Sequence, residues 1–207
     1  PRFIAWKPDI ILSNSYATKI MLVKKISIPE KKIRVLYNGI NTLKEYDHSC
    51  HHKKNNLKFR IGFIGRLDSP KGVHVLIDAM HYLKNKNFEL VIAGNGILES
   101  LLRERASALN NVSFIGRVKN PYLFMSKIDL LVVPSIREPL GNVCLEAGLC
   151  RVPVLAANVD GLPEIIENKI SGELIDATEE ISINTVQGAI SLPEFVVNPV
   201  KGNLSAP

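Results

Sequence analysis

Two acidic residues, separated by seven others, stand in the segment REPLGNVCLE, which covers residues 137–146. Pro139 disfavours helical backbone at the residue before it, so Glu138 is expected in an extended or turn conformation. Gly141 and Asn142 are expected to begin a helix. Its first N–H groups have no partner within the helix, and together with the helix dipole they form an anion-binding site.

Glu146 would lie about one turn into this helix. Carboxylates beside an anion site fit a ligand that carries hydroxyl groups as well as phosphate, because carboxylates accept hydrogen bonds from hydroxyls. A nucleotide sugar has this layout, with sugar hydroxyls, a diphosphate and ribose hydroxyls. In the alternative interpretation Glu138 is a loop acid paired with Arg137 or Arg151, and Glu146 is a surface helix residue.

The segment GRLDSPKG, residues 65–72, brings two cations into one loop. Gly65 ends an apolar run and lets the backbone approach a ligand closely. Arg66 and Lys71 suit a diphosphate, since arginine can contact two oxygens at once and lysine supplies a mobile charge. The alternative is a solvated basic loop before a helix.

Three further segments carry weaker signals. GNG at residues 94–96 lacks the third glycine of a dinucleotide fingerprint, which disfavours a nicotinamide-dependent oxidoreductase. In DGLPEI, residues 160–165, Glu164 is expected to stabilise the first turn of the helix in which it stands. HSCHH, residues 48–52, matches no zinc-ligand spacing, so we expect no metal site there.

Apolar segments rich in Val, Ile and Leu alternate with segments of helical periodicity from Leu57 onward. This alternation predicts an α/β fold with a doubly wound, Rossmann-like parallel sheet, in which ligands bind beyond the carboxyl ends of the strands. We expect strands at 59–65, 88–94, 112–116, 128–134, 152–158 and 171–175, and helices at 72–83, 97–109, 121–127, 141–149 and 162–168.

The two ends of the chain have a different pattern. The first part predicts a strand at 9–15, a helix at 16–25 and a strand at 32–39 that ends at an Asn-Gly turn signal. Residues 44–56 are polar and lack periodicity. After Asp176 the periodicity is weak, and we expect one helix near residues 181–190.

The net charge of +6 and the pI of about 9.2 come partly from lysine pairs at 24–25, 31–32 and 53–54. We favour solvated surfaces for these pairs, with a phosphate-bearing partner or an anionic membrane as the alternative.

No apolar run reaches the ~18–20 residues of a membrane span. The three cysteines are unpatterned, which fits a reducing compartment better than a disulfide scaffold. We therefore expect a cytoplasmic protein, with peripheral contact at the inner membrane face as a further option.

Several motifs in order resemble the C-terminal half of a retaining glycosyltransferase of the GT-B fold, family 4 type (glycosyl transferases group 1). Glu138 and Glu146 match the E-x7-E motif of that family, and GRLDSPKG matches its G-R-x-x-x-x-K-G loop. ELVIAGNG, VSFIGRV, LLVVPS, VPVLAANVDGLPEII and NKISGELI follow in the expected order. The resemblance covers residues 58–175, and the segment before it is similar to the end of the family's N-terminal domain.

The resemblance implies a division of the chain into four parts. Residues 1–43 would be the end of the N-terminal domain and the hinge, 44–57 a linker, 58–178 the nucleotide-sugar-binding domain and 179–207 a tail without a firm assignment. Most of the N-terminal domain, which normally supplies the acceptor site, has no counterpart in this sequence. We therefore expect the chain by itself to bind donor but to transfer sugar poorly or not at all.

The resemblance also implies roles for individual residues. Catalysis would rest on cations that stabilise the leaving diphosphate and on a carboxylate that binds the donor sugar: Arg66, Lys71 and Glu138. Donor binding would further involve Gly65, the backbone N–H groups of the helix start, a ribose-binding carboxylate and a segment that meets the base: Leu140, Gly141, Asn142, Glu146, Arg117 and Val118.

No cofactor or metal is expected, because the cations and the helix end would neutralise the diphosphate. The expected partners are a UDP- or GDP-linked sugar and a sugar or lipid-linked acceptor, and we expect no nucleic acid. Two alternatives stay open: a binding-only relative without turnover, and a sugar-nucleotide epimerase of similar fold.

Overall fold

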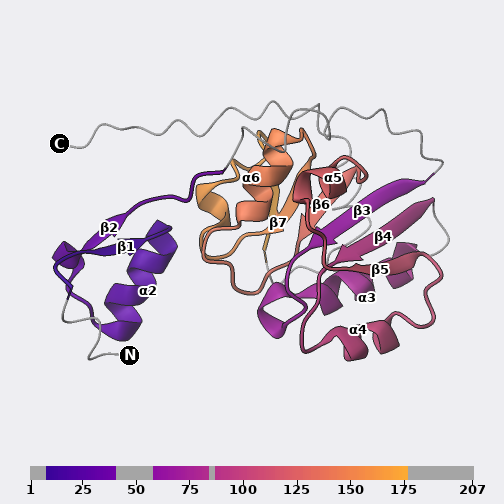
Figure 1. Ribbon diagram of the computed structural model, residues 1–207, viewed down its shortest axis with the longest axis horizontal. Coiled ribbons are helices and arrows are strands. Elements are labelled where there is room, and N and C mark those ends of the chain that lie inside the picture. The colour runs from indigo at the N-terminus through magenta and orange to yellow at the C-terminus, as the bar shows by residue number, and fades with distance from the viewer. Residues whose placement is uncertain (1–7, 41–57, 84–86, 177–207) are drawn as a thin grey trace.

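The computed structural model describes residues 8–40, 58–83 and 87–176, which form a small N-terminal unit (residues 8–40) and a main domain (residues 58–176) (Figure 1). The main domain contains a six-stranded parallel sheet. Its strands are β3 (Phe59–Ile64), β4 (Phe88–Ala93), β5 (Val112–Gly116), β6 (Leu130–Val133), β7 (Val154–Ala157) and β8 (Glu173–Ile175). The α-helices between them are α3 (Val73–Leu83), α4 (Glu99–Arg105), α5 (Pro121–Met125) and α6 (Asn142–Leu149).

Helices cover both faces of the sheet: α3 and α4 lie on one side and α5 and α6 on the other (Figure 1). Successive strand side chains point to opposite faces, and in β6 both sets are buried. Leu130 and Val132 join the core under α3 and α4, whereas Leu131 and Val133 join the core under α5 and α6. This burial on two faces explains the continuous apolar runs of the strands and confirms the predicted fold class.

The strand order is β5-β4-β3-β6-β7-β8. The chain moves outward in one direction from β3 to β4 and β5, and then returns to place β6 on the other side of β3. The loops that follow β3 and β6 therefore diverge from adjacent strands, and such a switch point leaves a crevice at the carboxyl ends of the strands. The two loops are those that carry GRLDSPKG and REPLGNVCLE.

The N-terminal unit is a parallel pair of short strands, β1 (Ile11–Ser13) and β2 (Ile33–Val35), connected through α2 (Tyr16–Ile26) and a 3₁₀ turn, Glu30–Lys32. Ser15 caps α2, because its hydroxyl accepts the N–H of Thr18 at 3.0 Å. The predicted strand–helix–strand order of this region is confirmed, with shorter strands than the sequence pattern predicted.

The remaining expectations concern the linker, the tail, the histidine cluster, membrane spans and the cysteines. The linker at 44–57, the tail at 179–207, the helix near 181–190 and the His48–His52 cluster lie outside the described residues. Within the described ranges no helix is long and apolar enough to cross a membrane. Cys144 is a free, buried thiol.

The two-sided core predicts a sharp difference between two leucine truncations. Leu90 in β4 is fully buried, whereas Leu101 in α4 is 58% exposed. Leu90→Ala should lower the free energy of unfolding by about 2–5 kcal/mol, because it removes buried apolar contacts and leaves a cavity. Leu101→Ala, the matched control, should change it by less than about 0.5 kcal/mol. Urea denaturation measures both, and equal effects would contradict this description of the core.

Candidate functional site

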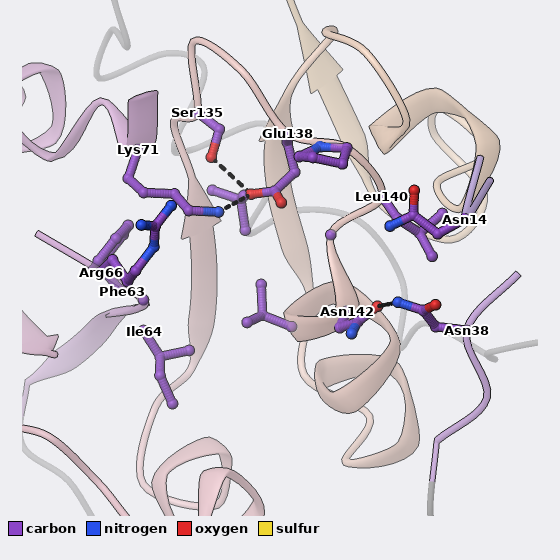
Figure 2. A pocket seen from close by; sticks show the side chains of 15 residues that line it. Asn14, Asn38, Phe63, Ile64, Arg66, Lys71, Ser135, Glu138, Leu140 and Asn142 are labelled. Atoms are coloured by element: carbon purple, nitrogen blue, oxygen red, sulfur yellow. Dashed lines mark hydrogen bonds and ion pairs between the residues drawn. The ribbon is translucent and has the colours of Figure 1, made fainter. Parts of the chain in front are cut away.

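A pocket of about 330 Å³ lies where the loops after β3 and β6 diverge (Figure 2). It contains most of the residues that the sequence singled out, namely Gly65, Arg66, Lys71, Glu138, Leu140, Gly141 and Asn142. The N-terminal unit contributes Asn14 and Asn38 to the same wall. Figure 2 shows these two side chains across the pocket from Arg66 and Lys71.

Backbone hydrogen bonds connect the loops after β3 and β6. The carbonyl oxygen of Pro70 accepts the N–H groups of Ile136 at 2.9 Å and Arg137 at 3.1 Å. Gly72 has φ of +64°, and a Cβ atom there would lie 1.9 Å from the carbonyl oxygen of Pro134. Only glycine permits this close approach, so the end of GRLDSPKG is held directly against the exit of β6.

The two cations of the first loop occupy different environments. The Arg66 side chain is 76% exposed and contacts Asp68 at 3.1 Å, which agrees in part with the solvated-loop alternative. The Lys71 side chain is 20% exposed, and its Nζ donates to Glu138 Oε2 at 2.6 Å. The loop thus offers one exposed cation at the surface and one largely buried cation inside the pocket.

Glu138 is buried, with 7% of its surface exposed. Besides Lys71, the Ser135 hydroxyl donates to the same carboxylate oxygen at 3.1 Å. A buried carboxylate needs such compensation, because removing a charge from water is costly. The alternative pairing of Glu138 with Arg137 or Arg151 is wrong: Arg137 Nε donates instead to Asp160 at 2.9 Å.

The start of α6 faces the pocket as expected. Gly141 is its N-cap residue, with φ of +95°, and a Cβ atom there would meet the Leu162 side chain at 2.6 Å. Among the described residues we find no acceptor for the N–H groups of Gly141, Asn142 and Val143. These N–H groups, at the positive end of the helix dipole, are suited to bind an anion.

Three predicted donor-binding residues are not part of the pocket wall: Glu146, Arg117 and Val118. Glu146 lies within α6 and is half-buried, and burial raises the pKa of its carboxyl group. Arg117 is exposed, whereas Val118 packs against the core under α5 and α6. Their assigned roles stay predictions. Across the described ranges, no three His, Cys, Asp or Glu side chains are grouped to hold a metal ion.

Sequence reasoning missed Asn14, Asn38 and Ser135 as pocket residues. Ser135 could have been found, because it directly follows the predicted strand at 128–134 and stands in the same loop as Glu138. Asn14 and Asn38 gave no such signal, since their position depends on how the N-terminal unit contacts the main domain. Asn38 Nδ2 donates to Asn142 Oδ1 at 3.0 Å, a contact between residues far apart in the chain (Figure 2).

The expectation that Glu164 stands in a first helical turn is confirmed, because Glu164 lies in the first turn of a 3₁₀ helix, Leu162–Glu164. Its carboxylate also accepts the N–H groups of Tyr16 and Ala17, both at 2.8 Å, in the first turn of α2. The same acid therefore stabilises the start of a second helix, which belongs to the N-terminal unit.

Comparison with known proteins identifies the family of this chain. The model of the family "Glycosyl transferases group 1" matches residues 47–193, which is more than half of the chain. The chain belongs to this family. The GRLDSPKG and REPLGNVCLE loops that line the pocket lie within the matched range.

Three similar proteins illustrate the relationship. An uncharacterized glycosyltransferase of Methanocaldococcus jannaschii, MJ1607, is 32% identical over 92% of this chain and 54% of its own length. A Campylobacter jejuni N-acetylgalactosaminyltransferase, named for a diphospho-undecaprenol-linked acceptor, is 32% identical over 86% of this chain and 49% of its own length. The structure of HepE from Anabaena in complex with UDP-glucose has 25% identity and a TM-score of 0.77, over 88% of this chain and 54% of HepE. The chain thus spans about half the length of these relatives.

The burial of Glu146 generates a pH-dependent prediction for this glycosyltransferase family member. The pKa of Glu146 is raised above its ordinary value of 4.5 by burial. A raised folded-state pKa means that the carboxylate disfavours folding at neutral pH, and that this effect disappears below the unfolded-state pKa. Glu146→Gln should therefore raise the urea midpoint at pH 7 and leave it nearly unchanged at pH 4.

The matched control is Glu167→Gln, because Glu167 is exposed. Its urea midpoint should stay near that of the wild type at both pH values. A lower midpoint for Glu146→Gln at pH 7 would show that the Glu146 carboxylate makes a stabilising contact.

Proposed function

We propose that this chain is the donor-binding half of a glycosyltransferase that transfers a sugar, with retention of anomeric configuration, from a nucleotide-diphosphate sugar to an acceptor. The observation that carries the proposal is the pocket at the switch point. It combines two cations, a helix start and a buried carboxylate within about 330 Å³. Family membership and the UDP-glucose bound to HepE support the same ligand class.

Arg66 and Lys71 would bind the donor diphosphate. When the bond between the anomeric carbon and the diphosphate oxygen breaks, the bonding electron pair goes to that oxygen, and nearby cations stabilise the developing charge. The Lys71 ammonium group has three N–H donors. It can therefore keep its 2.6 Å contact with Glu138 while it donates to a phosphate oxygen. We propose that these cations serve in place of a metal ion.

Glu138 would accept hydrogen bonds from the donor sugar hydroxyls. The N–H groups of Leu140, Gly141 and Asn142 would hold the sugar or the phosphate. Gly65 would allow close approach of the backbone. Glu146 would bind the ribose hydroxyls, and the segment of Arg117 and Val118 would meet the base through backbone groups. The last three residues lie outside the pocket wall, so their roles rest on the family resemblance.

The acceptor is proposed to be a saccharide or a lipid-linked saccharide of polysaccharide or glycolipid biosynthesis. The diphospho-undecaprenol-linked acceptor in the name of the Campylobacter jejuni relative supports this class. Lys24, Lys25 and Lys31 are exposed on the N-terminal unit, where they would attract an anionic lipid surface. We propose peripheral contact with the inner membrane face on this basis.

Removal of either cation should weaken binding of UDP or GDP. Arg66→Ala and Lys71→Ala should each cost more than about 1 kcal/mol of binding free energy, or more than about fivefold in Kd, because a charge-assisted hydrogen bond is lost. Isothermal titration calorimetry measures the change. Lys127→Ala, which removes an exposed cation away from the pocket, should leave the Kd unchanged.

Lys71→Ala also leaves Glu138 without its cation, so urea denaturation must accompany the titration to separate lost folding from lost contacts. An unchanged nucleotide affinity in both pocket variants would contradict the proposal that Arg66 and Lys71 bind the donor diphosphate. A donor-hydrolysis assay with UDP- and GDP-sugars would distinguish an enzyme from a binding-only relative. An epimerised nucleotide sugar in that assay would indicate the epimerase alternative.

A further inference from the structure

Glu164 connects the main domain to the N-terminal unit. Its carboxylate accepts three hydrogen bonds, from the backbone N–H groups of Tyr16 and Ala17 and from the hydroxyl of Tyr37, each at 2.8 Å. The backbone contacts join residues that are 147 and 148 positions apart. Among the described residues, this single side chain therefore makes three hydrogen bonds between the two parts.

The first turn of α2 depends on this carboxylate. The first N–H groups of a helix have no partner within it, and α2 has no acidic residue in its own first turn. The Ser15 hydroxyl accepts the N–H of Thr18. Glu164 accepts the two N–H groups before it, at the positive end of the helix dipole, where a carboxylate is favourable.

Tyr37 completes the contact from the end of the N-terminal unit. Burial and the neighbouring Glu164 carboxylate raise the pKa of Tyr37 to about 12, so the phenol stays protonated and donates at neutral pH. The centroid of the Tyr37 ring lies 6.4 Å from the centroid of the Tyr16 ring. The next residue, Asn38, contacts Asn142 at the start of α6 and lines the pocket.

The loop that carries Glu164 also holds the backbone of Glu138. Asp160 Oδ2 accepts the N–H of Glu138 at 3.0 Å, and the N–H of Gly161 donates to the Glu138 carbonyl oxygen at 3.0 Å. Residues 160–164, which we name the bridging loop, thus contact the backbone of Glu138 at one end and the N-terminal unit at the other.

We propose that Glu164 is a positioning residue, which holds the N-terminal unit on the bridging loop so that Asn14 and Asn38 complete the pocket wall across from Lys71. The carboxamides of these asparagines can both donate to and accept from the hydroxyl groups of a nucleotide sugar. The pocket then depends on docking of the N-terminal unit, and Glu164 is the main contact that secures it. This inference rests on the proposed function for the identity of the ligand, but not for the docking contact itself.

Hydrogen exchange tests the docking without any ligand. In Glu164→Gln and Glu164→Ala, the amides of Tyr16 and Ala17 should exchange at least about tenfold faster, since each loses a charge-assisted hydrogen bond. The matched control is Glu167→Gln, three positions along the chain and exposed, which should exchange like the wild type. Unchanged exchange in the Glu164 variants would overturn the proposal. Glu164→Gln preserves the side-chain shape and keeps the test valid where Glu164→Ala fails to fold.

A double-mutant cycle tests the positioning role. Asn14→Ala should weaken binding of UDP-glucose or GDP-glucose several-fold in the wild type, but not further in the Glu164→Ala background, because Asn14 has then left the pocket. Equal losses in the two backgrounds would show that Glu164 does not position Asn14, and would overturn the proposal. If the wild-type chain binds neither nucleotide sugar, the proposed function fails, while faster amide exchange would still support docking through Glu164.

Discussion

The ion pair between Lys71 and Glu138 joins the two loops from which the pocket is built. These loops leave adjacent strands, β3 and β6, and turn in opposite directions because the strand order reverses between them. The 2.6 Å contact connects them across the crevice. Since a buried carboxylate without a partner is costly, the burial of Glu138 constrains both loops to stay close. The backbone contacts of Pro70 and the glycine at position 72 make this closeness sterically possible.

The pair also prepares the site for an anionic ligand. Lys71 is held in the pocket by Glu138, whereas Arg66 is mostly exposed and pairs with Asp68. The N–H groups at the start of α6 add positive potential across the pocket from these two cations (Figure 2). The arrangement matches the alternating phosphates and hydroxyls of a nucleotide sugar better than it matches a simple phosphate, because a carboxylate beside a phosphate alone would be repulsive.

The pocket is not formed by the main domain alone. Asn14 and Asn38 reach it from the N-terminal unit, and the contacts of Glu164 and Asn142 hold that unit in place. The bridging loop links this contact to the backbone of Glu138. The segment DGLPEI, which the sequence indicated only as a helix start, thus connects the main domain to the N-terminal unit.

The sequence by itself determined the fold class, the order of the strands and helices, and the two loops that carry the site. These features depend on interactions between residues that are close in the sequence. Examples are the periodicity of apolar residues, the effect of Pro139 on its neighbour, and the preference of Gly141 for a helix start. Only the tertiary structure decided that Glu138 pairs with Lys71 rather than with an arginine, and that Glu164 caps a helix 148 residues away. Such contacts depend on which strands lie side by side and on which charges are buried together. Neither quantity is encoded in local sequence spacing.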